Sequence, residues 1–306
     1  MKVLVATQKP FAAAAVNGIR EILEAAGHDV VLLEKYAAQE ELTAAVANVE
    51  GLIVRSDKVT AEVIAAAPKL KIVVRAGAGF DNVDLAAASA RGIVVMNTPG
   101  QNSNAVAELA VAMMIYMART QFTPATGSEI SGKTLGIQAF GNVGRLVGAK
   151  AKALGMKVKA IDPFLKEEQI EAGGAEPAST LKDLYATSDF VSIHIPATPQ
   201  TIGSIGYTLI SSMPKGATLV NTARKEVIDE AGLEKALEER PDLKYITDVA
   251  PDNYAVLKEK FGLRVFATPK KMGAQTAEAN LNAGLAAARQ IADYFATGNT
   301  RFQVNR

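Results

Sequence analysis

Short runs of β-branched residues alternate with alanine-rich amphipathic segments along almost the whole chain. The first series of predicted strands covers 3–7, 29–34, 51–56, 71–77 and 92–99, with predicted helices at 14–27, 40–49, 61–70 and 84–92. Strands joined by helices form right-handed βαβ units, and such units build a parallel sheet that is covered on both faces. The alternation therefore predicts an α/β fold of the doubly wound type.

The alternation restarts after a long predicted helix at 103–120. Its second series of strands covers 134–140, 157–162, 190–196, 218–223, 244–250 and 264–269. We therefore expect two doubly wound parallel-sheet domains: a flavodoxin-like substrate domain (1–98 plus 284–306) and a Rossmann cofactor domain (99–283). The last predicted helix, 277–298, would return to cover the first sheet, and the active-site cleft would lie between the two domains.

Composition excludes several classes of function. The 33 basic and 32 acidic side chains nearly cancel, so no global field attracts nucleic acid or an anionic membrane. The chain has no cysteine and only two histidines, so we expect no metal site, no disulfide and no thiolate nucleophile. The apolar stretch 109–118 is too short to span a bilayer, which favours a cytoplasmic protein.

The segment after the strand 134–140 carries a dinucleotide-binding pattern. It fits G-x-G-x-x-G with Ala139 in the first position, followed by Gly141 and Gly144, and it opens a predicted helix. The glycines let the backbone approach a pyrophosphate at the helix N-terminus, where Asn142 and Val143 offer free N–H groups. Asp162 ends the next strand, where a carboxylate accepts hydrogen bonds from a ribose diol and repels a 2′-phosphate. We therefore expect NAD rather than NADP as the cofactor.

Two further segments carry a family resemblance. Residues 75–119 and 220–230 resemble the signatures of the D-2-hydroxyacid dehydrogenases, and the resemblance extends over essentially the whole chain. Within the family, "IVRSD", "RAGAGFDNVD" and "MNTPGQNSNAVAE" are most similar to enzymes acting on 3-phospho-D-glycerate. The resemblance implies NAD-dependent oxidation to 3-phosphohydroxypyruvate, the first step of the phosphorylated route to L-serine. It also implies a short form without a C-terminal regulatory domain.

The resemblance implies roles for residues of the second domain. Arg224 matches the catalytic arginine that pairs with the substrate carboxylate and polarises the C2 oxygen, a task suited to a planar, permanently charged guanidinium. Asp248 matches the aspartate that holds the nicotinamide carboxamide. The other residues of this domain that match cofactor contacts are His194, Ile195, Thr222, Ala223, Gly273 and Ala274, and Ala78 of the first domain matches one as well.

The substrate is expected to contact the first domain as well. A phosphorylated 2-hydroxy acid carries about three negative charges, so its site requires several cations although the chain is nearly neutral. Arg55 and Arg75 lie at the ends of predicted strands and are the candidates that join Arg224. The other matching positions near the substrate are Ser56, Gly77 and Asn102.

One motif departs from the family. The family acid/base is a histidine oriented by a glutamate, whereas this chain has "TPKKMGAQT" at 268–276 and Asn253 at the glutamate position. Counting back from "GAQT" places Lys271 on the histidine, and counting forward from "TP" places Lys270 there; we prefer Lys271. An ammonium has three equivalent donors and no tautomer, so a lysine needs no orienting glutamate. Because lysine has an ordinary pKa of about 10.4, we expect oxidation to have a more alkaline optimum than in relatives that carry the histidine.

Other interpretations stay open. On the same fold, the enzyme would be a glyoxylate or hydroxypyruvate reductase, or a D-lactate dehydrogenase. In a different class, it would be a non-catalytic NAD-sensing protein, against which the retained arginines argue. The apolar helix 103–120 suggests a homodimer through the cofactor domain, although simple core burial explains it equally well.

Overall fold

The computed structural model describes residues 1–305. The chain forms two compact units: Met1–Asn102 together with the chain from Gln275 onward, and Ser103–Ala274. The predicted boundaries, at 98/99 and 283/284, fall near these divisions. Helix α12 (Ala277–Thr297) is continuous and is capped by the Thr276 hydroxyl, so the whole helix goes with the first unit.

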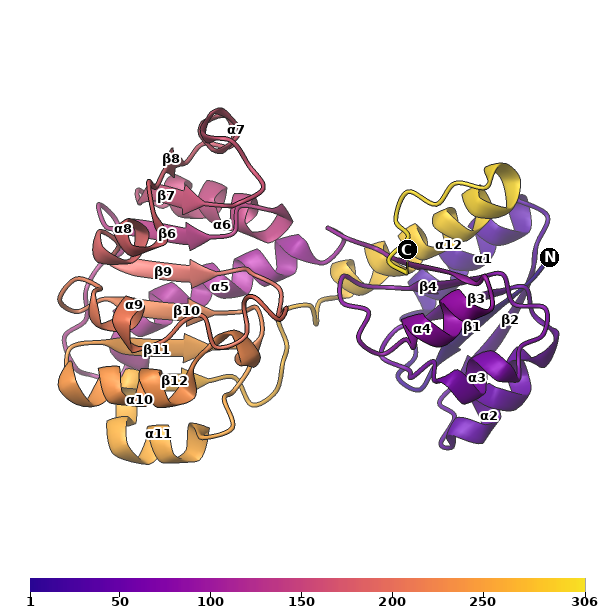
Figure 1. The fold of residues 1–306 in the computed structure, drawn as a ribbon, viewed down its shortest axis with the longest axis horizontal. Helices are drawn as coiled ribbons and strands as arrows, with labels where there is room; N and C mark the ends of the chain where they lie inside the picture. The colour runs from indigo at the N-terminus through magenta and orange to yellow at the C-terminus, as the bar shows by residue number, and fades with distance from the viewer. Residues whose placement is uncertain (306) are drawn as a thin grey trace. The chain divides into compact units, whose positions relative to one another are not determined.

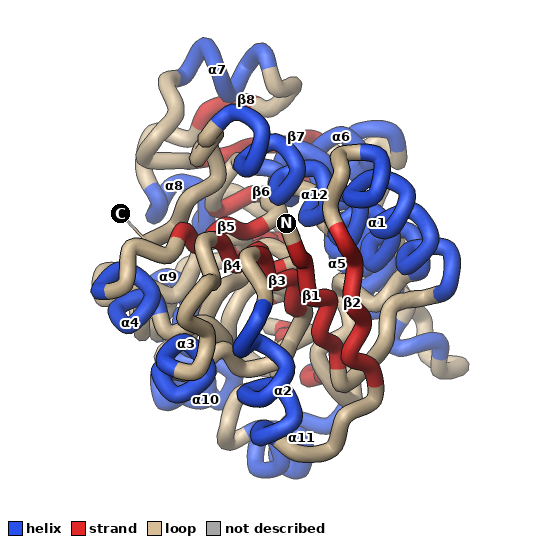
Figure 2. The backbone as a smooth tube through the Cα atoms, turned by 90° about the vertical axis from the view of Figure 1, so that its right-hand side faces the viewer, coloured by secondary structure: helices blue, strands red, loops and turns tan. Residues whose placement is uncertain are grey.

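The first unit contains a parallel five-stranded sheet. Its order is β2-β1-β3-β4-β5, with bounds Lys2–Thr7 (β1), Asp29–Glu34 (β2), Gly51–Val54 (β3), Ile72–Arg75 (β4) and Val94–Asn97 (β5). Figure 2 shows these strands side by side. The order is that of flavodoxin-like folds, which confirms the predicted fold class for this unit.

Helices cover both faces of this sheet. Helices α1 (Ala13–Ala25) and α12 share one apolar core with β1, β3 and β4. The other face is covered by α2 (Gln39–Ala45), α3 (Ala61–Ala65) and α4 (Leu85–Ala90). Helices α1 and α12 lie side by side (Figure 1), and a Cβ at Gly18 would come within 2.5 Å of Leu285 Cδ2. The terminal helix therefore packs closely on the first unit.

The second unit contains a parallel seven-stranded sheet. Its order is β12-β11-β10-β9-β6-β7-β8, with bounds Thr134–Gln138 (β6), Lys157–Ile161 (β7), Glu176–Pro177 (β8), Phe190–Ile193 (β9), Thr218–Asn221 (β10), Lys244–Thr247 (β11) and Val265–Ala267 (β12). The strand order reverses beside β6, as it does in Rossmann folds. The second predicted domain type is therefore confirmed, with β8 as a short addition that the sequence did not predict.

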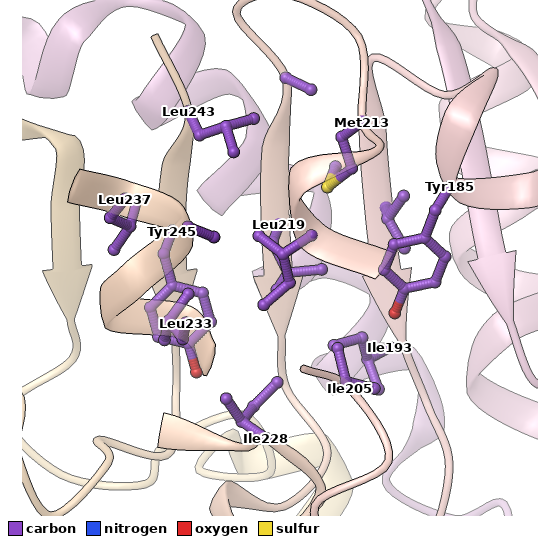
Figure 3. Close-up of a cluster of buried hydrophobic side chains, with 14 of the residues drawn as sticks. Tyr185, Ile193, Ile205, Met213, Leu219, Ile228, Leu233, Leu237, Leu243 and Tyr245 are labelled. Carbon is purple, nitrogen blue, oxygen red and sulfur yellow. The ribbon is translucent and has the colours of Figure 1, made fainter. Parts of the chain in front are cut away.

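Two apolar cores fill the faces of the second sheet. Helices α5 (Ser103–Ala118), α6 (Asn142–Ala153) and α7 (Glu167–Ala172) cover one face, and α8 (Leu181–Ala186), α9 (Tyr207–Ser211), α10 (Glu230–Glu239) and α11 (Tyr254–Phe261) contribute to the other. In Figure 3, Leu219 of β10 lies between Tyr185 and Tyr245 in the second of these cores. The burial of such large side chains holds the strand ends in place.

Helix α5 ends earlier than the sequence predicted. It stops at Ala118 rather than residue 120, because Thr120, Gln121 and Phe122 have φ values of 49°, 57° and 57°. This left-handed backbone cannot continue a right-handed helix. Within residues 1–305, no helix combines the length and the apolar character needed to cross a bilayer.

Candidate active site

The carboxyl ends of neighbouring strands are in register in the second sheet. Ile193 of β9 pairs with Asn221 of β10, Asn221 pairs with Thr247 of β11, and Thr247 pairs with Ala267 of β12. Gln138 of β6 pairs with Ile193 as well. The residues that follow these ends therefore emerge along one edge: Ala139, His194, Thr222, Asp248 and Thr268. Open α/β sheets bind ligands at this edge.

The dinucleotide motif has the geometry that its sequence predicts. A Cβ at Gly144 would lie 2.3 Å from the Ala139 carbonyl oxygen, so only glycine allows this approach of helix to strand. A Cβ at Gly141 would meet nothing within 4 Å, and within residues 1–305 no side chain caps the start of α6 there. The N-terminus of α6 thus offers open N–H groups to an anion.

Asp162 is fixed beside this motif by two backbone groups. Its carboxylate accepts from the Phe140 N–H at 2.8 Å and from the Phe164 N–H at 2.9 Å, one on each oxygen. Each carboxylate oxygen has room for about two hydrogen bonds, so each retains an acceptor site. The arrangement suits a vicinal diol such as that of a ribose.

Arg224 lies in a turn shaped by Asn221, a buried residue that sequence reasoning missed. The Asn221 side chain donates to the Arg224 carbonyl at 2.9 Å and accepts from the Ala223 N–H at 2.9 Å. The Arg224 guanidinium makes one hydrogen bond, from Nη1 to the Ala223 carbonyl. Its other N–H groups have no partner in the described part of the chain, and they remain available for a carboxylate.

Thr222 offers a direct test of whether a cofactor fits. Its side chain is buried, and among residues 1–305 its hydroxyl has no hydrogen-bond partner. Buried hydroxyls in folded proteins are normally paired. An unpaired hydroxyl at the carboxyl edge, in register with the other predicted contacts, is consistent with a polar ligand at this position.

Asp248 is almost completely buried, with 1% of its surface exposed. Its carboxylate accepts from the Thr268 hydroxyl at 2.8 Å, the Met272 N–H at 2.9 Å and the Gly273 N–H at 2.8 Å. All three donors belong to the loop after β12, which carries Lys270 and Lys271. The aspartate predicted to hold a carboxamide therefore also binds the loop of the predicted acid/base.

The two candidate lysines are both exposed. The acidic groups near the expected glutamate position are already engaged. Asp252 pairs with Lys225 at 2.5 Å, a contact that raises the lysine pKa, while Glu230 accepts from the Asp252 and Asn253 N–H groups. The loop at 251–253 is thus organised by contacts of its own.

His194 is the only histidine of this edge. Its Nε2 lies 2.9 Å from Ser192 Oγ, and its backbone N–H donates to the Gln138 carbonyl. Loss of solvation lowers the pKa of His194 to about 4. The imidazole is therefore neutral near pH 7 and only weakly basic, which supports a lining role rather than acid/base chemistry.

In the first unit, the guanidinium of Arg55 is already hydrogen-bonded. Its Nη1 lies 3.2 Å from the Lys9 carbonyl oxygen and 3.4 Å from that of Pro10, and Nη2 donates to Asn280 Oδ1. The group also lies 5.1 Å from the Phe11 ring centroid. Burial lowers the Arg55 pKa, although arginine stays charged at neutral pH.

Arg75 and Gly77 are tightly associated. The Arg75 Nε donates to the Arg55 carbonyl at 2.9 Å. A Cβ at Gly77 would lie only 1.6 Å from Arg75 Nη1, and Gly77 has a φ of +151°. Only glycine at position 77 leaves room for the arginine in this orientation.

Sequence reasoning also missed Asp57, which lies beside these arginines and is 5% exposed. Its carboxylate accepts from the Gln8 N–H at 2.6 Å, the Tyr36 hydroxyl at 2.7 Å and the Arg55 N–H at 3.3 Å. Burial and this hydrogen bond raise the pKa of Tyr36. Asp57 therefore joins the loops that follow β1, β2 and β3.

The predicted site residues divide between the two units. The first unit contains Arg55, Ser56, Arg75, Gly77, Ala78 and Asn102, and the second contains Gly141, Asn142, Val143, Gly144, Asp162, His194, Ile195, Thr222, Ala223, Arg224, Asp248, Lys270, Lys271, Gly273 and Ala274. Ser56 and Ala78 are exposed, and the Ala78 carbonyl accepts from Asn97 Nδ2 at 2.6 Å. In each unit, the carboxyl edge of the sheet carries most of the predicted contacts.

Comparison with known proteins identifies the family. The model of the D-isomer specific 2-hydroxyacid dehydrogenase catalytic domain matches residues 10–305. A crystal structure of NAD⁺-bound 3-phosphoglycerate dehydrogenase from Entamoeba histolytica is 50% identical, covers 100% of this chain and 99% of that chain, and has a TM-score of 0.90.

Longer relatives share the same region. D-3-phosphoglycerate dehydrogenase of Rattus norvegicus is 38% identical over 293 residues, which are 90% of this chain and 54% of that protein. The Mycobacterium tuberculosis protein of the same name is 38% identical over 267 residues, 83% of this chain and 50% of that protein. The chain spans about half the length of these curated relatives. It belongs to the D-isomer-specific 2-hydroxyacid dehydrogenase family.

Proposed function

We propose that this chain is an NAD-dependent D-3-phosphoglycerate dehydrogenase that oxidises 3-phospho-D-glycerate to 3-phosphohydroxypyruvate. The observation that carries the proposal is the 50% identity, over the whole chain, to the Entamoeba histolytica enzyme of that name. The open N-terminus of α6 and the Asp162 carboxylate support NAD as the cofactor. Bound there, NAD would supply the hydride acceptor.

The second unit supplies the proposed catalytic groups. Arg224 binds the substrate carboxylate and polarises the C2 oxygen through the N–H groups that its turn leaves open. Lys271, or alternatively Lys270, takes the C2 hydroxyl proton during oxidation and returns it during reduction.

The first unit supplies the proposed phosphate contacts, from Arg55 and Arg75. A second candidate, an unphosphorylated 2-hydroxy acid as substrate, is favoured by one observation. The Arg55 guanidinium is already bonded to the Lys9 and Pro10 carbonyls and to Asn280. An Arg55→Gln enzyme separates the two candidates. It loses activity on the phosphorylated acid selectively if Arg55 binds phosphate, and equal activity on both acids favours the second candidate.

The central test is NADH formation from 3-phospho-D-glycerate by the purified chain, with the keto acid trapped, and NADH consumption in reverse. Lys271→Ala is expected to lower turnover by about 10²- to 10⁴-fold, the usual contribution of a general acid or base. Lys270→Ala is the matched variant, since it removes the same charge one residue away. Unchanged turnover in both variants would rule out the lysine chemistry, and no activity in the parent chain would rule out the assignment.

We extend the proposal to the setting of the reaction. It would open the phosphorylated route to L-serine in the cytoplasm, in a homodimer formed through the cofactor-binding unit. Most apolar residues of α5 are buried in the core of its own unit, so the homodimer is proposed on the family resemblance alone. Light scattering of the purified chain measures the oligomeric state directly.

A further inference from the structure

The carboxylate of Asp248 is placed to control the loop that carries both candidate lysines. Its three donors are the Thr268 hydroxyl and the Met272 and Gly273 N–H groups. These donors flank Lys270 and Lys271 on both sides in the sequence. The Thr268 hydroxyl also lies 2.9 Å from the Lys270 carbonyl oxygen, so its single proton is shared between the carboxylate and the loop.

The acceptor capacity of Asp248 is mostly used by this loop. A carboxylate has about four acceptor sites, two on each oxygen. Oδ1 receives Thr268 and Met272, whereas Oδ2 receives Gly273 alone. One site on Oδ2 therefore remains for a carboxamide N–H, while the other three hold the loop. Contact with the cofactor and support of the loop are compatible in one side chain.

The backbone of Asp248 is in turn fixed to the turn of Arg224. Its N–H donates to the Asn221 carbonyl at 3.0 Å, and the Thr247 hydroxyl donates to the same carbonyl at 2.9 Å. The Asn221 side chain shapes the Arg224 turn, as described above. A continuous series of hydrogen bonds thus runs from Arg224 through Asn221 and Asp248 to the lysine loop.

We propose that Asp248 is a positioning residue that holds the loop 268–273 so that its lysine ammonium stands in a fixed relation to Arg224. The inference rests on the proposed function, because it needs a lysine as the acid/base. Asp248 acts through the loop, and any bond to the cofactor is additional. The three hydrogen bonds from the loop to Asp248 form what we call the brace. We therefore expect loss of the brace to lower turnover more than cofactor affinity.

Thr268→Val and Thr268→Ser form the matched pair for the test. Valine keeps the shape and removes the hydroxyl, whereas serine keeps the hydroxyl. Loss of one hydrogen bond to a buried carboxylate predicts a kcat about tenfold lower for Thr268→Val, with NADH affinity within about twofold of the parent. Thr268→Ser is expected to restore kcat, and the alkaline limb of the pH profile is expected to shift only in the valine enzyme.

The outcomes separate this inference from the proposed function. Unchanged kcat in Thr268→Val, with activity lost in Lys271→Ala or Lys270→Ala, overturns the positioning role of Asp248. The lysine chemistry then still stands. A kcat loss matched by an equal loss of NADH affinity also overturns the positioning role, because Asp248 would then act through the cofactor. Full activity in both lysine variants overturns the lysine chemistry and the inference together.

A structural readout tests the brace without any turnover. Asp248→Ala removes both carboxylate oxygens, so the Met272 and Gly273 amides both lose their acceptors. Hydrogen exchange at these two amides is expected to become faster by about tenfold or more, while exchange in β12 stays unchanged. Unchanged protection at both amides would show that the loop does not depend on Asp248.

Discussion

The carboxyl edges of the two sheets differ in how their polar groups are paired. At the edge of the first sheet, the Asp57 carboxylate and the Arg55 guanidinium are bonded to groups from several loops of the same unit. At the edge of the second sheet, the Thr222 hydroxyl and the start of α6 have no such partners among the described residues. Both edges contain buried threonine hydroxyls without a partner among the described residues, Thr7 and Thr98 at the first and Thr222 at the second. The edges differ in that the charged groups of the first are bonded within the unit, whereas the second leaves the start of a helix open.

The difference indicates how binding would be divided between the two units. Groups that are already bonded in the free protein are pre-organised, so they lose little conformational entropy when a ligand binds. Groups without partners gain most from a ligand, because a buried unpaired polar group is costly. At the second edge, the start of α6 and the Thr222 hydroxyl therefore gain most from a ligand, whereas the bonded charged groups of the first edge supply shape and charge.

The largest expected effect is on stability at the first edge. Asp57→Ala removes the acceptor of the buried Tyr36 hydroxyl and of the Gln8 N–H. Unpaired buried donors cost about 1–3 kcal/mol each, so the free energy of unfolding should fall by about 3 kcal/mol. Denaturant unfolding measures it, with Asp81→Ala at an exposed position as the control. Equal stability of the two variants would remove the distinction between the edges.

A smaller effect, on acid stability, is expected at the second edge. Burial lowers the pKa of His194 to about 4 from an ordinary 6.5, so the unfolded chain binds a proton that the folded chain excludes. Neutral His194 makes its full contribution to the free energy of unfolding above about pH 6.5. This contribution is lost as the pH falls towards 4, by at most about 3 kcal/mol. His194→Gln should lose less stability than the parent across this window. An NMR titration of His194 with a midpoint near 6.5 would contradict the shift.

The smallest effect concerns strain in the dinucleotide motif. Ala139 has a φ of 74°, in the left-handed region that costs a residue with a side chain about 1–2 kcal/mol. Ala139→Gly is expected to raise the free energy of unfolding by about 1 kcal/mol, less the entropy that glycine adds to the unfolded chain. Ala149→Gly on the exposed side of α6 is the control and should lower it by about 1 kcal/mol. A loss of stability in both variants would show that Ala139 is not strained.

Much of the fold could be predicted because its signals are local. Each β-branched run became a strand, and the spacing of Gly141, Gly144 and Asp162 was enough to place the motif between β6 and β7. The family followed from segments that are continuous in the sequence. The early end of α5 was missed because the left-handed backbone at 120–122 involves no glycine or proline to mark it.

The supporting residues could not be predicted for a different reason. Asp57 accepts hydrogen bonds from the loops after β1, β2 and β3, and these loops come together only when the sheet forms. Asn221 and the three bonds of Asp248 depend in the same way on strand register. The sequence predicts which residue types lie at an edge, but hydrogen bonds between loops distant in the chain appear only with the tertiary structure.

The packing of α12 on the first sheet also has a consequence for biosynthesis. Because Ala283, Ala287 and Ile291 complete a core begun by Val3 and Val5, the layer that α12 shares with α1 stays incomplete until the ribosome has made the last helix. The intervening unit, Ser103–Ala274, has all its strands earlier. Domains generally fold as units during synthesis, so the inserted unit should fold first and the unit that contains the N-terminus last.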